Sequence, residues 1–138
     1  MVLNILQIDG EQTLDLRQQV LWPNETKEFC KVPGDENATH FGAYFNDSLI
    51  GVASIYDSEG GIRLRKFAVD KAHQGNGVGS AMLDHIINEV KKTEASSFWC
   101  DARESASSFY NRFGLLIEGE RFFKADIPYF KMILSLNH

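Results

Sequence analysis

The chain has 138 residues, a formal net charge of −5 and 12% aromatic residues. This length predicts one domain over residues 1–138, and the aromatic content argues against a disordered chain. The acidic balance disfavours a broad surface for nucleic acid or anionic membranes, because such surfaces are basic. No stretch has the length of a transmembrane helix, and residues 1–10 lack the basic start of a signal peptide, so we expect a cytoplasmic protein.

The N-terminal third predicts a strand, a helix and an irregular linker. Residues 2–8 alternate between apolar and polar side chains, which is typical of a strand. Thr13 is a candidate N-cap for a helix that ends before Pro23. The apolar positions of this helix are Leu14, Leu16, Val20 and Leu21. Residues 22–39 are polar and rich in turn formers, and such a linker is either functional or a simple connection.

The next segments predict three consecutive strands. Residues 40–45 and 49–56 alternate as strands, and the polar turn at residues 46–48 joins them into a hairpin. A second turn-rich stretch, residues 57–61, leads into a third strand over residues 62–69.

Three alternating glycines follow this third strand, and a helix follows the glycines. Gly75, Gly77 and Gly79 precede an apolar stripe at helical spacing. The first amides of a helix are unpaired and carry partial positive charge, and glycines let an anion approach them, so the arrangement predicts a phosphate site. A P-loop is disfavoured because no lysine follows, and the dinucleotide fingerprint fails at Ser80 or at Met82.

The region after this helix predicts a strand and a further helix. Residues 97–100 form a short strand, parallel to the strand over residues 62–69 because the helix makes the crossover. Asp101 and Glu104 have the spacing of a capping box. The helix that follows carries an apolar stripe formed by Ala102, Ala106, Phe109, Tyr110 and Phe113. Gly114 stands where a helix commonly ends in a left-handed residue.

Two motifs resemble those of the GNAT superfamily of N-acetyltransferases. Gln74-Gly75-Asn76-Gly77-Val78-Gly79 resembles its Q/R-x-x-G-x-G/A signature, and the segment from Ala106 to Gly114 resembles its A-x-x-F/L-Y-x-x-x-G motif. They stand in the expected order, separated by one helix and one strand. A subgroup of small uncharacterised members is matched in more detail, through Leu16-Arg17, Gly34-Asp35-Glu36, His40, Arg65-Lys66-Phe67-Ala68 and Ala102-Arg103.

The order of elements is similar to the GNAT fold over nearly the whole chain. Strands over residues 115–118 and 129–136, around a turn at residues 127–128, close the series. The resemblance implies an α/β (α+β) fold with a central mixed, mostly antiparallel sheet and helices on both faces. The strands over residues 62–69 and 97–100 are then parallel and splayed around acetyl-CoA.

The resemblance also implies an acyltransferase that moves the acetyl group of acetyl-CoA to a primary amine by direct attack. The cofactor-binding loop is then Gln74, Gly75, Asn76, Gly77, Val78, Gly79 and Ser80, and the backbone of Phe67, Ala68 and Val69 binds the pantetheine arm. Tyr110 becomes the general acid, since a phenol with a pKa of about 10 can protonate a departing thiolate. The alternative is that Tyr110 is a core residue of its apolar stripe.

The sequence does not identify the general base. The candidates are Asp35, Glu36, His40, Asp101 and Glu104, each of which is also typical of a solvated charge or a turn. Arg65, Asp101 and Tyr129 are candidate substrate contacts. Arg63 and Arg65 lie on one side of their strand, where internal pairing with acids such as Asp35 or Glu36 is favoured over an anionic substrate group.

The expected partners are a small-molecule or peptide amine and acetyl-CoA, with the chain a monomer or homodimer. No nucleic acid, membrane or metal is expected, since no two histidines have metal-ligand spacing. Cys30 and Cys100 are expected to be reduced thiols. Two alternatives remain: a non-catalytic acyl-CoA-binding or interaction module with the same fold, and transfer of a longer acyl group.

Overall fold

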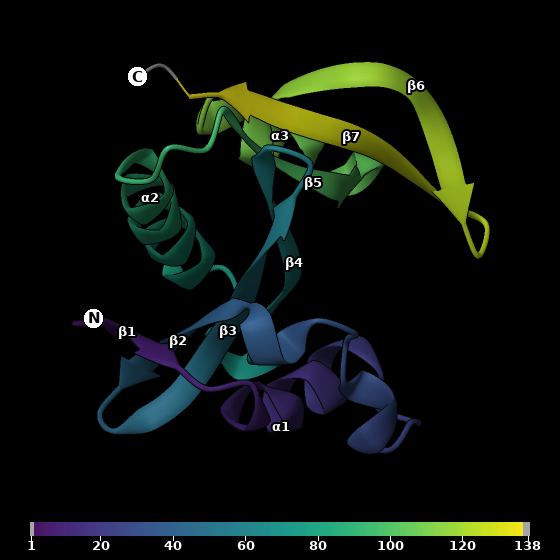
Figure 1. The fold of residues 1–138 in the computed structure, drawn as a ribbon. Helices are drawn as coiled ribbons and strands as arrows, with labels where there is room; N and C mark the ends of the chain where they lie inside the picture. Colours follow the sequence, from purple (N-terminus) through teal and green to yellow (C-terminus); the bar gives the residue numbers. More distant parts are fainter. Residues whose placement is uncertain (1, 137–138) are drawn as a thin grey trace. The chain divides into compact units, whose positions relative to one another are not determined.

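The structure is a computed structural model that describes residues 2–136, and the chain divides into two compact units (Figure 1). The first unit covers Met1–Tyr56 and Leu64–Ile86, and the second covers Asp57–Arg63 and Ile87–His138. That residues 1–138 form one domain stays a prediction.

Seven strands hydrogen-bond in the order β1-β2-β3-β4-β5-β7-β6. Their bounds are Asn4–Ile8, Thr39–Phe45, Ser48–Ser58, Gly61–Val69, Ser97–Arg103, Leu116–Lys124 and Ile127–Ser135 for β1 to β7. The pairing of β4 with β5 is parallel, whereas β1 with β2, β2 with β3, β5 with β7 and β6 with β7 are antiparallel. The predicted mixed, mostly antiparallel sheet is therefore confirmed.

The helices are short except for one. They are α1 at Leu14–Leu16, α2 at Val78–Lys91 and α3 at Ser107–Arg112. Single 3₁₀ turns lie at Glu11–Thr13, Glu28–Cys30, Asp35–Asn37, Lys71–His73 and Glu104–Ala106, and a π-helical turn at Arg17–Leu21 extends α1.

The first helical segment begins earlier than its sequence predicted. Asp9 and Gln12 form a reciprocal capping box, in which the Gln12 amide donates to Asp9 Oδ1 (3.1 Å) and the Asp9 amide donates to Gln12 Oε1 (3.0 Å). Thr13 makes no side-chain cap, because its hydroxyl donates to the Gly10 carbonyl (2.6 Å) instead. The predicted end before Pro23 is confirmed, since Trp22 leaves helical geometry at φ −141°.

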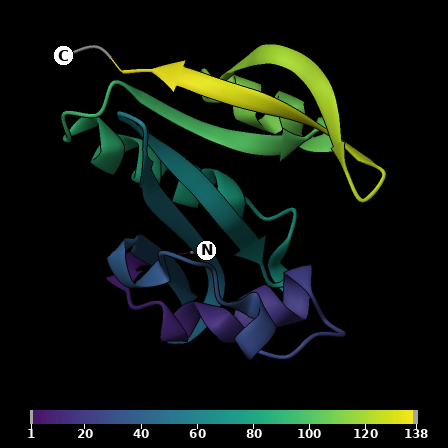
Figure 2. The ribbon, with the colours of Figure 1, turned by 45° about the vertical axis from the view of Figure 1, so that its right-hand side comes forward.

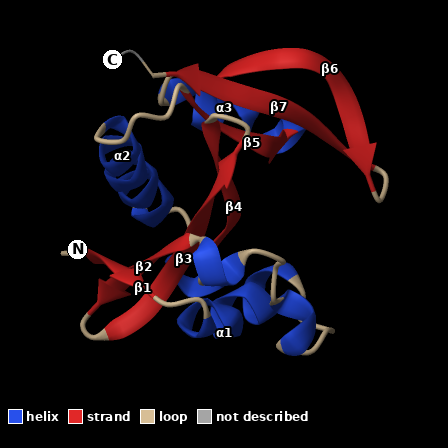
Figure 3. Ribbon diagram, viewed as in Figure 1, coloured by secondary structure: helices blue, strands red, loops and turns tan. Residues whose placement is uncertain are grey.

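Helices lie on both faces of the strands in the first unit. On one face, Leu16 packs with Val52 and Ala68 in a buried apolar cluster, and Figure 3 shows α1 against β1, β2 and β3. On the other face α2 approaches closely, because a Cβ at Gly51 would lie 2.7 Å from Met82 Sδ. Gly51 thus permits the close contact between β3 and α2.

Two hairpin turns depend on left-handed residues. Asn46 and Asp47 have φ values of 51° and 66°, which confirms the predicted turn between β2 and β3. The turn between β6 and β7 lies at Ala125 and Asp126, with φ values of 48° and 64°. The predicted turn at residues 127–128 is therefore wrong: Pro128 lies in β7 opposite Phe123, and β6 extends to Lys124.

The second unit consists mainly of β5, β7 and β6, with α3 beside them (Figure 2). The predicted capping box at Asp101 is wrong, because Asp101 lies inside β5, which extends to Arg103. Its carboxylate accepts a hydrogen bond from Arg63 Nη2 (2.9 Å) rather than from helix amides. Gly114, with φ 94°, ends α3 in the predicted left-handed conformation.

One buried arginine joins the irregular linker to the strands of the first unit. The Arg17 side chain has 0% exposure, and its guanidinium donates to both carboxylate oxygens of Asp35, at 2.8 and 3.1 Å. It also donates to the Cys30 carbonyl (3.1 Å) and to Ser54 Oγ on β3 (3.0 Å). Because a buried charge is tolerated only when it is paired and hydrogen-bonded, these bonds hold the linker in one conformation.

Arg17→Met should lower the free energy of unfolding by about 3–5 kcal/mol, because it leaves the Asp35 carboxylate without its cation. Urea unfolding followed by circular dichroism measures this change. Lys27→Met is the matched control: Lys27 pairs with Asp15 on the surface, with 59% and 67% exposure, so its loss should cost at most about 1 kcal/mol. Equal losses in the two variants would show that the Arg17 pair does not organise the linker.

Candidate functional site

The glycine loop between β4 and α2 has the backbone that an anion site requires. Gly75 and Gly77 have φ values of 81° and 84°, in the left-handed region. A Cβ at either position would meet no described atom within 4 Å, so the space beside the loop is open. The Gln74 side chain donates to the Val69 carbonyl (2.9 Å) and ties the loop to the end of β4.

The loop leads directly into the unpaired end of α2. The Ala81 amide donates to the Gly77 carbonyl (3.0 Å), so the amides of Val78, Gly79 and Ser80 lie ahead of this first helical bond. The helix dipole adds partial positive charge at this end of α2. The loop and the helix start together can therefore receive a phosphate group.

Strand β4 contains a residue in an unusual conformation. Lys66 has φ 56°, which is uncommon for a residue with a side chain and interrupts the extended repeat immediately before Phe67. Ala68 is buried at 2% exposure in the apolar cluster with Leu16 and Val52. The ladder with β5 joins Ile62 to Phe98 and Arg63 to Trp99, near the start of β4.

Tyr110 lies on α3 in the second unit, whereas the glycine loop lies in the first. Its ring contacts the Phe109 ring edge-on, with the centroids 5.2 Å apart. Burial, and to a smaller degree the neighbouring Cys100, raises the pKa of Tyr110 well above its ordinary value. The phenol therefore stays protonated throughout the physiological range.

Asp35 is a poor general base in this structure. Burial raises its pKa, but bonds from the Arg17 guanidinium, the Tyr56 hydroxyl and the Val32 amide outweigh burial and hold the pKa at about 2. Burial and the bond to Asp35 raise the pKa of Tyr56 to about 12, so Tyr56 remains the donor in this contact. A carboxylate with such a low pKa has little affinity for a substrate proton at pH 7.

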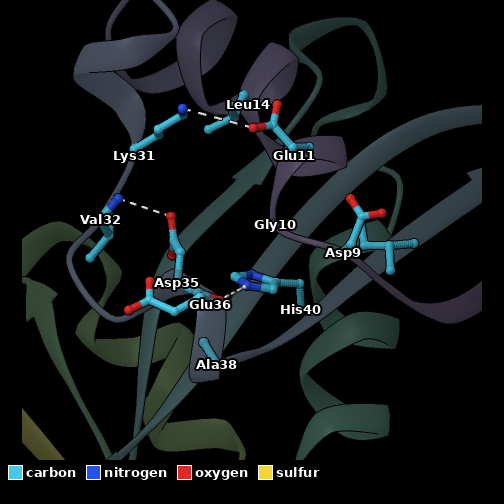
Figure 4. Close-up of a pocket in the computed structure, with 11 residues that line it drawn as sticks. Asp9, Gly10, Glu11, Leu14, Lys31, Val32, Asp35, Glu36, Ala38 and His40 are labelled. Carbon is cyan, nitrogen blue, oxygen red and sulfur yellow. Dashed lines mark hydrogen bonds and ion pairs between the residues drawn. The ribbon is translucent and has the colours of Figure 1, made fainter.

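His40 is also occupied on both ring nitrogens. Its Nε2 lies 2.8 Å from the Asp35 carbonyl, and its Nδ1 lies 2.6 Å from Ser54 Oγ. Because a carbonyl only accepts, we assign the proton to Nε2, and the Nδ1 lone pair accepts from the Ser54 hydroxyl. Figure 4 shows Asp35, Glu36 and His40, three of the five base candidates, on one cavity of about 450 Å³.

In the second unit, two predicted substrate contacts come together through Lys124. Asp101 Oδ2 accepts bonds from Arg63 Nη2 (2.9 Å) and Lys124 Nζ (3.3 Å). Lys124 Nζ also lies 4.9 Å from the centroid of the Tyr129 ring. Glu104, another base candidate, pairs with Arg121 at 3.2 Å on the surface.

The two β4 arginines have different surroundings. Internal pairing is confirmed for Arg63, but its partner is Asp101 rather than Asp35 or Glu36. Arg65, the third predicted substrate contact, lies in the first unit with its guanidinium 5.7 Å from the centroid of the Tyr56 ring.

Sequence reasoning missed Ser54 and Tyr56, which bind Arg17 and Asp35. Their signal was a hydroxyl at alternate positions of a strand whose neighbours are apolar. Such a hydroxyl needs a partner when the strand is buried, and Ser54 has 0% exposure.

Among residues 2–136, no group of three or more His, Cys, Asp or Glu side chains is placed to hold a metal. No helix in the same residues combines the length and apolar character that crossing a membrane requires.

Comparison with known proteins gives concordant matches. The family model described as "Acetyltransferase (GNAT) domain" matches residues 9–136. The "Uncharacterized N-acetyltransferase YitI" of Bacillus subtilis is 27% identical over 136 residues, which cover 92% of this chain and 89% of YitI.

Two solved structures illustrate the similarity of fold. The ribosomal-protein alanine N-acetyltransferase of Escherichia coli has a TM-score of 0.82 and 18% identity, covering 99% of this chain and 96% of its own. A GNAT family acetyltransferase of Elizabethkingia anophelis, solved with acetyl-CoA bound, has a TM-score of 0.77 and 16% identity. The match covers 97% of this chain and 98% of the Elizabethkingia chain.

The depressed pKa of Asp35 makes part of the stability depend on pH. A carboxyl whose pKa falls from 3.8 to about 2 on folding stabilises the fold above about pH 4, and this contribution is lost as the pH falls through about 2. The difference in free energy of unfolding between the parent and Asp35→Asn should therefore shrink by about 2 kcal/mol from pH 6 to pH 2. Urea unfolding at several pH values measures it, and a constant difference would contradict the assignment.

Proposed function

The chain belongs to the GNAT acetyltransferase family, and we propose that it transfers the acetyl group of acetyl-CoA to a primary amine of a small molecule or peptide by direct attack. The observation that carries this proposal is the glycine loop. Its left-handed glycines, the open space beside Gly75 and Gly77 and the unpaired start of α2 suit a pyrophosphate. The experiment that tests the activity is an acetyl-CoA turnover screen over polyamines, amino acids, aminosugars, aminoglycosides and peptide amines.

In this proposal the first unit holds the CoA moiety. The amides and side chains from Gln74 to Ser80 receive the pyrophosphate, and the backbone of Phe67, Ala68 and Val69 binds the pantetheine arm. The left-handed Lys66 supports this role, because it turns the backbone of β4 directly before those three residues. Bound acetyl-CoA supplies a thioester, whose carbonyl carbon is the electrophile.

Tyr110 acts as the general acid that protonates the departing CoA sulfur. Burial keeps the phenol protonated until the carbon–sulfur bond breaks and negative charge develops next to it. A residue that serves only the packing of α3 needs no hydroxyl.

The acceptor amine loses its proton without help from Asp35 in this proposal. At pH 7 the loss costs about 4.6 kcal/mol for a lysine-like amine and about 1.4 kcal/mol for an α-amine. Asp101 and Glu104 are held in ion pairs and His40 is bonded on both nitrogens. We therefore assign proton removal to water, with Glu36 the remaining candidate base. Arg65, Asp101 and Tyr129 stay candidate acceptor contacts.

Gly77→Asp should weaken CoA binding by about 100-fold or more, because it places a Cβ and a negative charge where the pyrophosphate lies. Isothermal titration calorimetry with CoA measures the loss. Gly119→Asp is the matched control, since Gly119 also has a left-handed φ (81°) with no described atom within 4 Å of an added Cβ. It carries the same strain and charge on β6 of the second unit, outside the proposed loop, so it should bind CoA like the parent. Equal affinities in Gly77→Asp and the parent would remove the loop from the site.

Tyr110→Phe should lower kcat by about 10²- to 10⁴-fold while the Kd of acetyl-CoA changes little, because the hydroxyl acts only in the transition state. The melting temperature should stay close to that of the parent, since phenylalanine keeps the packed ring. Steady-state kinetics and a thermal melt of one preparation measure both, with Tyr44→Phe on β2 as the control substitution. An unchanged kcat, with chemistry shown to be rate-limiting, would exclude Tyr110 as the acid and favour a binding or structural role.

A further inference from the structure

Lys66 has a left-handed backbone conformation inside β4. Its φ is 56°, in a strand that extends from Gly61 to Val69, so it produces a kink in that strand. For a residue with a Cβ this conformation costs free energy and persists only where the surrounding structure favours it. The local sequence gives no reason for it, because no glycine, asparagine or aspartate stands at position 66 or beside it. The kink is therefore supported by tertiary contacts.

The indole of Trp22 provides such a contact. Lys66 Nζ lies over the Trp22 ring, 4.5 Å from its centroid, within the range of a cation–π interaction. Burial raises the pKa of the Cys30 thiol, and the charges of Arg17 and Lys66 act in the opposite direction, so the Lys66 amine also lies near the turn at Glu28–Cys30. Because a bulged residue directs its side chain differently from an extended one, this contact favours the left-handed conformation.

Trp22 is itself held by the chain on both sides of it. Its amide donates to the Arg17 carbonyl (3.3 Å), where the helical segment ends, and its carbonyl accepts from the Glu25 amide (3.1 Å). Phe29 contacts the indole edge-on, with the ring centroids 5.4 Å apart and the rings at 86°. The indole therefore presents a fixed face to the Lys66 amine.

The position of Phe29 depends on the buried arginine. Phe29 is next to Cys30, whose carbonyl accepts a hydrogen bond from Arg17 Nη1 (3.1 Å). The Phe29 amide donates to Thr26 Oγ1 (3.1 Å), which fixes the start of the same turn. The linker that Arg17 organises thus places Phe29 against Trp22, and Trp22 lies beneath the side chain of the strained residue in β4.

We propose that Trp22 is a positioning residue for the cofactor: its contact with Lys66 holds the kink that comes directly before Phe67, Ala68 and Val69. This role rests on the proposed function, in which the backbone of these three residues binds the pantetheine arm. The kink sets the direction of their N–H and C=O groups, and a relaxed strand would direct those groups elsewhere. Trp22 acts on the reaction only through Lys66 and β4, and it needs no contact with the reacting atoms.

The first measurement uses the free protein and needs no ligand. The Cα and carbonyl NMR shifts of Lys66 distinguish a left-handed residue from an extended one. They should move toward extended values in Trp22→Leu and less far in Trp22→Phe, which keeps a ring that binds cations more weakly and carries the test if the leucine variant does not fold. Trp99→Leu is the matched control, because Trp99 lies 4.8 Å from Lys131 Nζ in the second unit. Unchanged Lys66 shifts in the Trp22 variants would overturn the proposal.

The second measurement compares two ligands by isothermal titration calorimetry. One is CoA, and the other is adenosine 3′-phosphate 5′-diphosphate, which has the pyrophosphate but lacks the pantetheine arm. Trp22→Leu should weaken CoA binding by about 3- to 10-fold, because fewer molecules have the kink, and should leave the shorter ligand within about 2-fold of the parent. Equal weakening of both ligands would indicate a general loss of structure, and unchanged CoA affinity would show that the pantetheine segment needs no support. Either result would overturn the positioning role.

Lys66→Gly tests the mechanism by rescue, because glycine adopts a left-handed angle without a supporting contact. Combined with Trp22→Leu, it should return CoA affinity to within about 2-fold of Lys66→Gly alone. A double variant that binds CoA as weakly as Trp22→Leu would contradict the proposal. A parent protein that binds neither ligand would refute the proposed function and the positioning role with it, whereas the Lys66 shifts of the free protein decide separately whether Trp22 holds the kink.

Discussion

The bond between Arg17 and Asp35 is the constraint on which the first unit depends. A guanidinium with 0% exposure needs its partners inside the protein, and its two terminal nitrogens find them in Asp35, the Cys30 carbonyl and Ser54, whereas Nε has no partner among the described residues. Cys30 and Asp35 lie in the irregular linker over residues 22–39, and Ser54 lies on β3. One buried charge thus holds the linker, α1 and β3 in a single arrangement, and the wall of the cavity near His40 follows from it.

The same network moves the pKa values of two acids in opposite directions. The pKa of Asp35 falls to about 2, because bonds from Arg17 and Tyr56 favour the carboxylate, whereas burial raises the pKa of Tyr56 to about 12. Tyr110 in the second unit is kept protonated mainly by burial. At neutral pH Asp35 stays ionised and both tyrosines stay protonated, as is ordinary for their residue types, and their surroundings reinforce these states.

Left-handed residues lie at both ends of the segment that leads from β4 to α2. Lys66 adopts φ 56° at some energetic cost, and Gly75 and Gly77 adopt similar angles without a side chain to strain. The left-handed angle favours glycine in the loop, and the missing Cβ leaves the space beside it open. At Gly10 the angle is ordinary, and a Cβ there would lie 3.3 Å from His40 Nε2, so the close approach of His40 favours glycine.

The sequence by itself determined the features that depend on neighbours along the chain. The hairpin turn at Asn46 and Asp47, the glycine loop before α2 and the end of α3 at Gly114 were all predicted, because each is set by the local backbone preference of one or two residues. The order of strands and helices followed from the same local patterns, and the resemblance of two motifs to those of the GNAT superfamily predicted the family.

Only the tertiary structure decided which partners the charged side chains bind. The spacing of Asp101 to Glu104 fits a capping box, yet Asp101 lies in β5 because pairing with β7 and the bond to Arg63 stabilise the strand further. Arg17 meets Asp35 across 18 residues of chain, and no local preference encodes that contact. Long-range pairing of charges depends on which segments the folded core brings together, and for that reason the partners of Arg17, Arg63 and Asp35 could not be predicted from the chain alone.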